Sequence, residues 1–158
     1  LPEAQLDRFF MKIAIGYPTC DEEISILERF TSGARPMETV RPICSAQDIV
    51  DMQQMVAQVY SSREVRSYIS LIAQASRKHN ALQLGVSTRG AIFLLKAAQA
   101  RALLSGRDYV TPEDVQYMAA PVLAHRLILS PEARMRNMTA ERVLSQVIGS
   151  VQVPVRTA

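Results

Sequence analysis

The sequence predicts a mainly α-helical fold, a helical bundle preceded by one β-strand. The strand is indicated by apolar residues that alternate with others from Phe10 to Ile15. After Tyr17 and Pro18 the apolar residues recur at the spacing of amphipathic helices almost everywhere. The chain has 158 residues, 48% of them hydrophobic, which is enough for one globular domain with a core. We divide it into a first segment at 1–17, a helical domain at 18–152 and a tail at 153–158.

The strand at 10–15 has no evident partner of comparable pattern. A single strand leaves its backbone groups without a ladder, so its neighbours are expected either upstream of Leu1 or in weakly patterned segments elsewhere. The chain also starts with a polar loop instead of an initiator Met, a signal sequence or a helix start. We therefore expect the chain to be a fragment that begins in the middle of a domain.

Two helices are predicted in the next part of the chain. Asp21-Glu22-Glu23 places acidic residues in the first turn of a helix, where the helix dipole favours them, and Gly33 ends that helix. A loop with two prolines follows, from Thr31 to Cys44. Ser45-Ala46-Gln47-Asp48 then resembles a capping box, and the helix that it opens carries apolar residues at helical spacing as far as Val59.

Further helices follow to the end of the chain, with a polar connection at 79–85. One runs from Ser62 to about Lys78, with an apolar stripe formed by Val65, Tyr68, Ile69, Ile72 and Ala73. A longer one runs from Ser87 to Ser105. The next is opened by Thr111 as N-cap and Pro112 at the first helical position, and its apolar face holds Val115, Met118, Ala119, Val122 and Leu123. A short turn is predicted from Ser130 and a last helix from Thr139.

Composition excludes little but gives some defaults. Eighteen basic and fifteen acidic residues give a net charge of +3, too small and too scattered to require a nucleic acid or a membrane as partner. Cys20 and Cys44 are far apart without metal-ligand spacing, so neither a disulfide framework nor a metal site is predicted. This cysteine usage makes a reducing cytoplasm the default localisation, and no apolar run approaches membrane-spanning length.

Arg89 is the residue that a plain helical bundle does not explain. It falls in the first turn of the helix from Ser87, close to unsatisfied backbone N–H groups and the positive end of the dipole. A cation there is unfavourable, so an anionic group is expected nearby. The small neighbours Thr88 and Gly90 would let a phosphate approach the backbone. On spacing alone, the favoured interpretation is solvent exposure or pairing with an acid from another helix.

Five stretches of the sequence stand out when they are taken together. They are LPEAQLDRF at 1–9, GYP at 16–18, STRGA at 87–91, GRDYVTPEDV at 106–115 and VLAHRL at 122–127. In this order they closely resemble the MoxR family of AAA+ ATPases, and the resemblance covers nearly the whole chain. It implies the carboxy-terminal part of such an ATPase: the last strand of the nucleotide-binding α/β core, the remnant at 1–17, followed by the helical lid domain at 18–152.

The resemblance also implies roles for two arginines. By residue type alone, Arg8 is a surface arginine that pairs with Asp7 or Glu3. In the family pattern it falls where the arginine finger lies, which reaches the nucleotide of the adjacent subunit. Arg89 falls where the sensor-2 arginine lies, which contacts the phosphates of ATP in its own subunit. The implied parent is a chaperone-like motor that binds ATP and Mg²⁺, forms a homo-oligomeric ring, expected to be a hexamer, and works with von Willebrand factor A domain proteins on target complexes.

The chain departs from the family in what it lacks. No glycine is followed by Lys, so the GxxxxGK[ST] loop that cradles phosphates is absent. The apolar strand with an acidic pair that holds Mg²⁺ and the sensor-1 strand are absent too. We therefore expect the chain alone to lack catalytic activity and to bind no nucleotide.

Other conspicuous residues are given structural interpretations. His125 is expected to be a hydrogen-bonded packing residue, and Met52 and Met55 are expected to fill a core. Further arginines are expected to lie on solvated faces, with a minor alternative of contact to a neighbouring subunit; they are Arg101, Arg107, Arg126, Arg134 and Arg136.

A second function class stays open beside the ATPase. A stand-alone helical module of this composition could bind protein surfaces or nucleic acid without any nucleotide. A GxxxxGK[ST] motif in the sequence that precedes Leu1 would favour the ATPase, and a steep salt dependence of DNA binding would favour the nucleic-acid form of the alternative.

Overall fold

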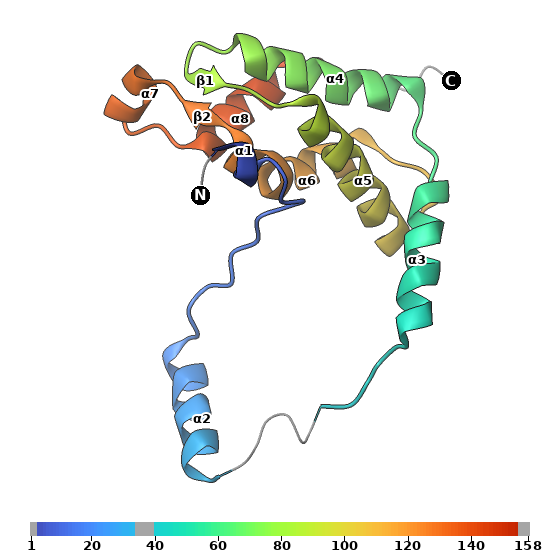
Figure 1. The fold of residues 1–158 in the computed structure, drawn as a ribbon, viewed down its shortest axis with the longest axis vertical. Coiled ribbons are helices and arrows are strands. Elements are labelled where there is room, and N and C mark those ends of the chain that lie inside the picture. Colours follow the sequence, from blue (N-terminus) through green and yellow to red (C-terminus); the bar gives the residue numbers. More distant parts are fainter. Residues whose placement is uncertain (1–2, 34–39, 155–158) are drawn as a thin grey trace. The chain divides into compact units, whose positions relative to one another are not determined.

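The computed structural model of the chain describes residues 3–33 and 40–154 (Figure 1). These residues fall into two compact units, a large unit from Leu1–Lys12 and Gln53–Ala158 and a small unit from Ile13–Met52. In this division the N-terminal segment of the large unit ends at Lys12, whereas the sequence predicted that the first segment ends at residue 17. The assignment of 1–17, 18–152 and 153–158 to separate domains stays a prediction, and the last four residues of the tail lie outside the described part.

The small unit contains α2 (Cys20–Thr31) and the beginning of α3 (Ala46–Gln58). At the start of α2, Thr19 and Glu22 form a reciprocal capping box, in which the Thr19 N–H donates to the Glu22 carboxylate and the Glu22 N–H to Thr19 Oγ1. Ser45 and Asp48 do the same for α3. Each box satisfies two backbone N–H groups that have no partner within the helix. Both predicted helices therefore begin directly after their capping residues.

The large unit contains the remaining predicted helices. The long ones are α4 (Arg63–Lys78), α5 (Thr88–Leu104), α6 (Pro112–Leu123) and α8 (Ala140–Ser150). The short elements are α1 (Glu3–Leu6), the 3₁₀ turn η2 (Ala124–Arg126) and α7 (Pro131–Met135). A serine or threonine precedes each long helix as N-cap. For α6 this residue is Thr111, as the sequence predicted. The mainly α-helical fold is therefore confirmed.

The core of the large unit is formed where α4, α5, α6 and α8 pack against one another (Figure 1). All five residues of the stripe predicted for α4 are buried. On α6 the predicted apolar residues are buried too, except that Met118 is half-buried. Each fully buried aliphatic or aromatic side chain of this kind contributes about 1.5–3 kcal/mol. The core thus fixes the two elements that matter below, the start of α5 and the η2 turn at the end of α6.

A two-stranded antiparallel sheet joins the polar connection 79–85 to the segment after η2. β1 (Leu82–Leu84) pairs with β2 (Ile128–Leu129), and the Ser130 N–H continues the pairing to the Ala81 carbonyl at 2.9 Å. This sheet was not predicted, because strands of two or three residues are too short to show an alternating pattern. Its effect is to hold the loop before α5 beside the chain that leaves η2.

The predicted strand at residues 10–15 is wrong. The described residues show no ladder there, and one backbone bond is formed, from the Lys12 N–H to the Pro121 carbonyl at 2.8 Å. Alternation alone does not make a strand, because each strand needs a neighbour to take up its N–H and C=O groups. The apolar side chains have other positions: the Phe10 ring lies 5.2 Å from that of Phe93, and Ile15 is exposed.

The core role expected for Met52 and Met55 is wrong as well. Both side chains are exposed, and α3 has no buried residue. Methionine at helical spacing identifies an apolar face but not what covers it. None of the helices in the described part of the chain combines the length and the apolar character needed to span a membrane.

Candidate functional site

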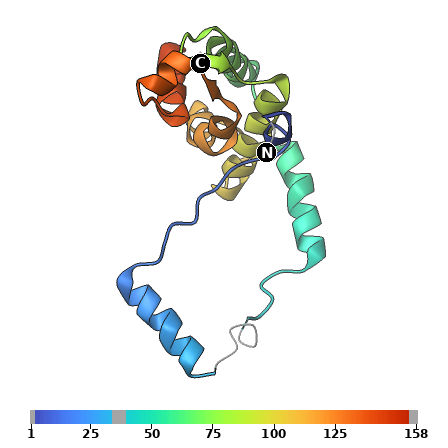
Figure 2. The same ribbon diagram turned by 60° about the vertical axis from the view of Figure 1, so that its left-hand side comes forward.

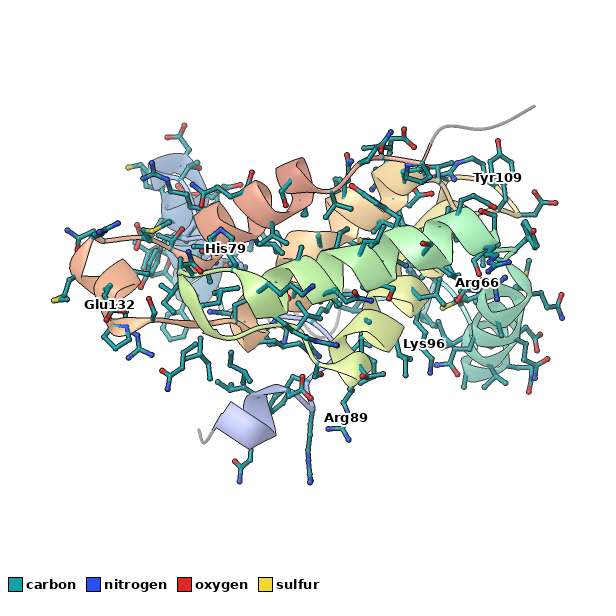
Figure 3. The ribbon with its side chains drawn as sticks, turned by 90° about the horizontal axis from the view of Figure 1, so that it is seen from above. Arg66, His79, Arg89, Lys96, Tyr109 and Glu132 are labelled. Carbon is teal, nitrogen blue, oxygen red and sulfur yellow. The ribbon has the colours of Figure 1, made fainter. Side chains whose placement is uncertain are left out.

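The first turn of α5 is closed by its own N-cap. Ser87 Oγ accepts a hydrogen bond from the Gly90 N–H at 3.0 Å. A Cβ at position 90 would lie 3.0 Å from Val86 Cγ1 and 3.2 Å from Arg126 Cδ, so glycine lets this turn lie directly against Arg126. The side chain of Arg89 is 52% exposed. It points away from the helices, on the side where α1 lies (Figure 3).

The anionic group expected near Arg89 is the carboxylate of Asp7, in the turn after α1. Its Oδ2 lies 3.6 Å from Arg89 Nη1. Its Oδ1 accepts a hydrogen bond from Ser87 Oγ at 2.9 Å and lies 3.3 Å from Arg126 Nε. One carboxylate therefore contacts the N-cap, the exposed arginine and a buried arginine. Its negative charge at the start of α5 is favourable with respect to the helix dipole.

Arg126 lies in the interior, and its expected place on a solvated face is wrong. Its side chain is 1% exposed. One terminal nitrogen donates to the Val122 carbonyl, and the other to the carbonyls of Phe9 and, at 3.3 Å, Asp7. A buried guanidinium is tolerated only when its charge has a partner and its N–H groups have acceptors. The Asp7 carboxylate is the charge partner, and the terminal nitrogens have carbonyl acceptors, whereas Nε is buried without a hydrogen bond. Figure 2 shows α1, which precedes Asp7, beside the helices of the large unit.

His125 has the hydrogen-bonded packing role that the sequence suggested, in η2 instead of a regular helix. It is half-buried, and its Nε2 lies 2.6 Å from Arg126 Nη1 and 3.4 Å from the Phe9 carbonyl oxygen. Burial first, and then the positive charge of Arg126, lower the pKa of His125 below its ordinary value.

A cavity of about 860 Å³ opens beside this network. Five arginines line it: Arg8, Arg77, Arg89, Arg126 and Arg134. Asp7 is the acidic residue among the described residues of the lining. The structure thus places both sequence-predicted site residues, Arg8 and Arg89, on the same cavity, with Arg8 exposed. An excess of guanidinium groups suits a ligand with several anionic oxygens, such as a chain of phosphates.

The motif GRDYVTPEDV builds a second polar cluster, for which the sequence offered no structural role. Arg107 donates two hydrogen bonds of 2.7 Å to the two carboxylate oxygens of Asp114, which is 2% exposed. Arg101 Nε lies 3.3 Å from the same carboxylate, and its guanidinium lies 3.4 Å above the Tyr117 ring. The expectation that Arg101 and Arg107 lie on solvated faces is therefore wrong, and both belong to an intramolecular ion-pair cluster.

The Asp114 carboxylate also belongs to the N-cap of α6. It accepts from the Thr111 N–H at 2.9 Å and from the Thr111 hydroxyl at 3.1 Å. Burial alone would raise the pKa of Asp114, but the hydrogen bonds from Arg107 and Thr111 outweigh it and lower the pKa below its ordinary value. This cluster positions the loop between α5 and α6. The signal in the sequence was the acid three residues after Thr111, which marks a capping box.

Residues 74–147 match a protein family described as the AAA lid domain. The match contains α5, η2, Arg89 and Arg126, whereas Asp7 and Arg8 precede it. Over these residues the chain is therefore similar to known lid domains in sequence.

Relatives align with nearly the whole chain. The uncharacterized protein YeaC of Bacillus subtilis is 44% identical over 99% of this chain and 48% of its own length. The chaperone MoxR1 of Mycobacterium tuberculosis is 34% identical over 98% of this chain and 42% of its own. A crystal structure from Cytophaga hutchinsonii, described as a proposed ATPase, superposes with a TM-score of 0.87 at 31% identity and covers 98% of this chain and 49% of that one. The chain spans about half the length of these relatives.

Proposed function

This chain belongs to the MoxR-like AAA+ proteins, of which it carries the lid domain, and we propose on that premise that it serves a longer ATP-hydrolysing motor. In this motor Arg89 binds the phosphates of the nucleotide in its own subunit. Arg8 acts as an arginine finger on the nucleotide of the adjacent subunit. The parts that bind the nucleotide and its Mg²⁺ come from outside the 158 residues, so the chain alone is proposed to be inactive.

The observation that supports this proposal best is the exposure of Arg8 and Arg89, since each side chain can be reached by a ligand, Arg89 by the nucleotide of its own subunit and Arg8 by that of the adjacent subunit. Guanidinium groups bind phosphate through paired hydrogen bonds, and in a desolvated site they stabilise charge that develops on the transferred phosphoryl group. An arginine finger contributes roughly 10³- to 10⁵-fold to the rate of nucleotide hydrolysis in such enzymes.

The residues of the chain fit the phosphates better than they fit Mg²⁺. The described part of the chain holds no group of three or more His, Cys, Asp or Glu side chains that could bind a metal ion. Asp7, the acid in the cavity lining, is already paired with two arginines. When bound, Mg²⁺ would neutralise phosphate charge, and we propose that its carboxylate ligands come from the nucleotide-binding core.

The setting of this motor follows from the same proposal. A finger that acts on a neighbour requires a closed ring of subunits, for which six is the expected number. We further propose a chaperone-like role in the assembly or activation of target complexes, with von Willebrand factor A domain proteins as partners in the cytoplasm. Similarity to a chaperone, MoxR1, supports the first part of this statement.

The test uses the full-length protein that contains this chain. Arg8→Ala is expected to lower the steady-state ATPase rate roughly 10³-fold or more. Arg89→Ala is expected to lower it about ten- to a hundredfold, the effect of losing one charge-assisted contact. Arg142→Ala, an exposed arginine on α8, is the matched control and should leave the rate unchanged. Wild-type turnover in both Arg8→Ala and Arg89→Ala would refute the proposal.

Mixing the two variants tests which arginine acts on the neighbour. A subunit with Arg8→Ala keeps its own Arg89 and can receive Arg8 from an adjacent Arg89→Ala subunit. Random mixing in equal amounts should therefore restore activity in roughly a quarter of the sites of a head-to-tail ring. If both arginines served the same subunit, the mixture would be no more active than the average of its components.

A further inference from the structure

We propose that Asp7 holds Arg89 while no terminal phosphate is present and releases it to the terminal phosphate of bound ATP. Asp7 is then a positioning residue that competes with the nucleotide for the lid arginine. The inference rests on the proposed function, because it concerns the same Arg89, and it adds an intramolecular competitor to that site.

The two oxygens of the Asp7 carboxylate have different partners. Oδ1 accepts the hydrogen bond from Ser87 Oγ at 2.9 Å and lies 3.3 Å from Arg126 Nε, which belongs to a buried side chain. Oδ2 faces Arg89 Nη1 at 3.6 Å, beyond hydrogen-bond length. Arg89 can therefore leave Oδ2 while Ser87 and Arg126 keep the carboxylate in place. The structure separates an anchored side of Asp7 from a side that can exchange its partner.

The exchange is favourable because the existing contact is weak. Arg89 is 52% exposed, and an ion pair of this exposure shifts an equilibrium by no more than about fivefold. A phosphate group carries more charge than one carboxylate and offers a guanidinium two oxygens at once. The other arginines of the cavity lining add to the attraction for phosphate and not for Asp7, which is already anchored. Asp7 therefore keeps Arg89 near its binding position, and the contact is weak enough for a bound nucleotide to displace it.

A simple charge effect would give part of the same behaviour. Removing one negative charge from a cavity with five arginines strengthens the binding of any anion, whether or not Arg89 is involved. The two explanations differ in one respect. Competition for Arg89 disappears when Arg89 is absent, whereas a general charge effect remains. A double-mutant cycle between Asp7 and Arg89 separates them.

The experiment measures dissociation constants of β,γ-imido ATP and ADP for the full-length protein, its Asp7→Asn and Arg89→Ala variants, and the double variant. Asparagine keeps an oxygen that can accept from Ser87 Oγ but removes the charge that faces Arg126 Nε, so circular dichroism first checks that the variant is folded. We expect Asp7→Asn to tighten binding of the ATP analogue by about 1.5- to 5-fold and that of ADP by less. In the Arg89→Ala background the same change should tighten binding by less, because only the general charge effect remains. Glu132→Gln, an exposed acid outside this cavity, is the control.

Equal tightening in both backgrounds, or none in either, would overturn the inference. If Arg89→Ala itself leaves nucleotide binding and hydrolysis unchanged, it is the proposed role of Arg89 that fails. Should Asp7→Asn prevent folding, a crystal structure of the wild-type protein with β,γ-imido ATP decides. Arg89 is expected on the terminal phosphate, with the contacts of Asp7 to Ser87 and Arg126 retained. Arg89 still on Asp7 in that complex would refute the exchange.

Discussion

Replacing Asp114 by alanine should be among the most destabilising single changes in this chain, because one buried carboxylate serves two purposes. It accepts two 2.7 Å hydrogen bonds from Arg107, and it also accepts from the Thr111 N–H at the start of α6. A charge-assisted pair of this kind contributes about 1.5–3 kcal/mol, and an N-cap about 1 kcal/mol. The expected loss in the free energy of unfolding is therefore roughly 3 kcal/mol for Asp114→Ala.

The measurement is urea unfolding of the 158-residue chain, followed by circular dichroism, together with thermal unfolding. A loss of about 3 kcal/mol corresponds to a fall in Tm of roughly 6–12 °C for a chain of this size. Asp114→Asn keeps an acceptor for the Thr111 N–H but loses the charge, so it should lie between alanine and the wild type. Glu113→Gln changes the exposed acid next to it and should cost less than about 1 kcal/mol.

The pH dependence gives a second measurement on the same residue. Asp114 has a pKa below that of the unfolded chain, so its stabilisation is present above about pH 4 and is lost as the pH falls through the folded value. The difference between wild type and Asp114→Asn should therefore shrink in acid. If Asp114→Ala costs no more than Glu113→Gln at pH 7, the ion-pair cluster does not stabilise the loop and our argument is refuted.

Two further predictions concern the surroundings of the cavity. The pKa of His125 is lower in the folded chain than in the unfolded one, so the unfolded chain takes up the proton first as the pH drops. The free energy of unfolding should therefore fall below about pH 6.5. In His125→Gln this fall between pH 7 and 5 should be smaller, and an unchanged slope would contradict the prediction. Gly85→Ala should cost about 1–3 kcal/mol in chemical denaturation, because a Cβ there would lie 2.6 Å from the Arg77 backbone nitrogen. Gly149→Ala, in α8 with open space around it, should stabilise instead.

The helices could be predicted from the sequence because two local signals agree. Each of Ser62, Ser87, Thr111 and Thr139 can cap a helix, and each is followed by apolar residues at helical spacing. Both signals depend on residues a few positions apart, and in the structure the four caps and the apolar helix faces are found at the positions that these signals indicate. The short sheet and the missing strand depend on pairing between distant segments, which a local pattern does not encode.

The site was partly predictable in the same sense. A cation in the first turn of α5 implied a nearby anion, and Asp7 is there, 82 positions before Arg89 by their numbers. Which arginines are buried could not be read from the sequence, because an arginine looks the same whether it is solvated or paired. Arg126 finds an acceptor at Phe9, 117 positions away, whereas Arg107 finds Asp114 seven positions along the chain, across the loop between α5 and α6.

The bonds of Arg126 to Asp7 and Phe9 also decide how this domain can be cut for expression. A lid that starts at Gln53, or one cut to residues 74–147, contains Arg126 and the Val122 carbonyl but not the carbonyls of Asp7 and Phe9 or the Asp7 carboxylate. Such a piece would lose the charge partner of Arg126 and the acceptors of its second terminal nitrogen, and removing one partner of a buried ion pair is strongly destabilising. A stable recombinant lid needs the peptide around Asp7 supplied with it, either in the same chain or as a separate synthetic segment added in trans.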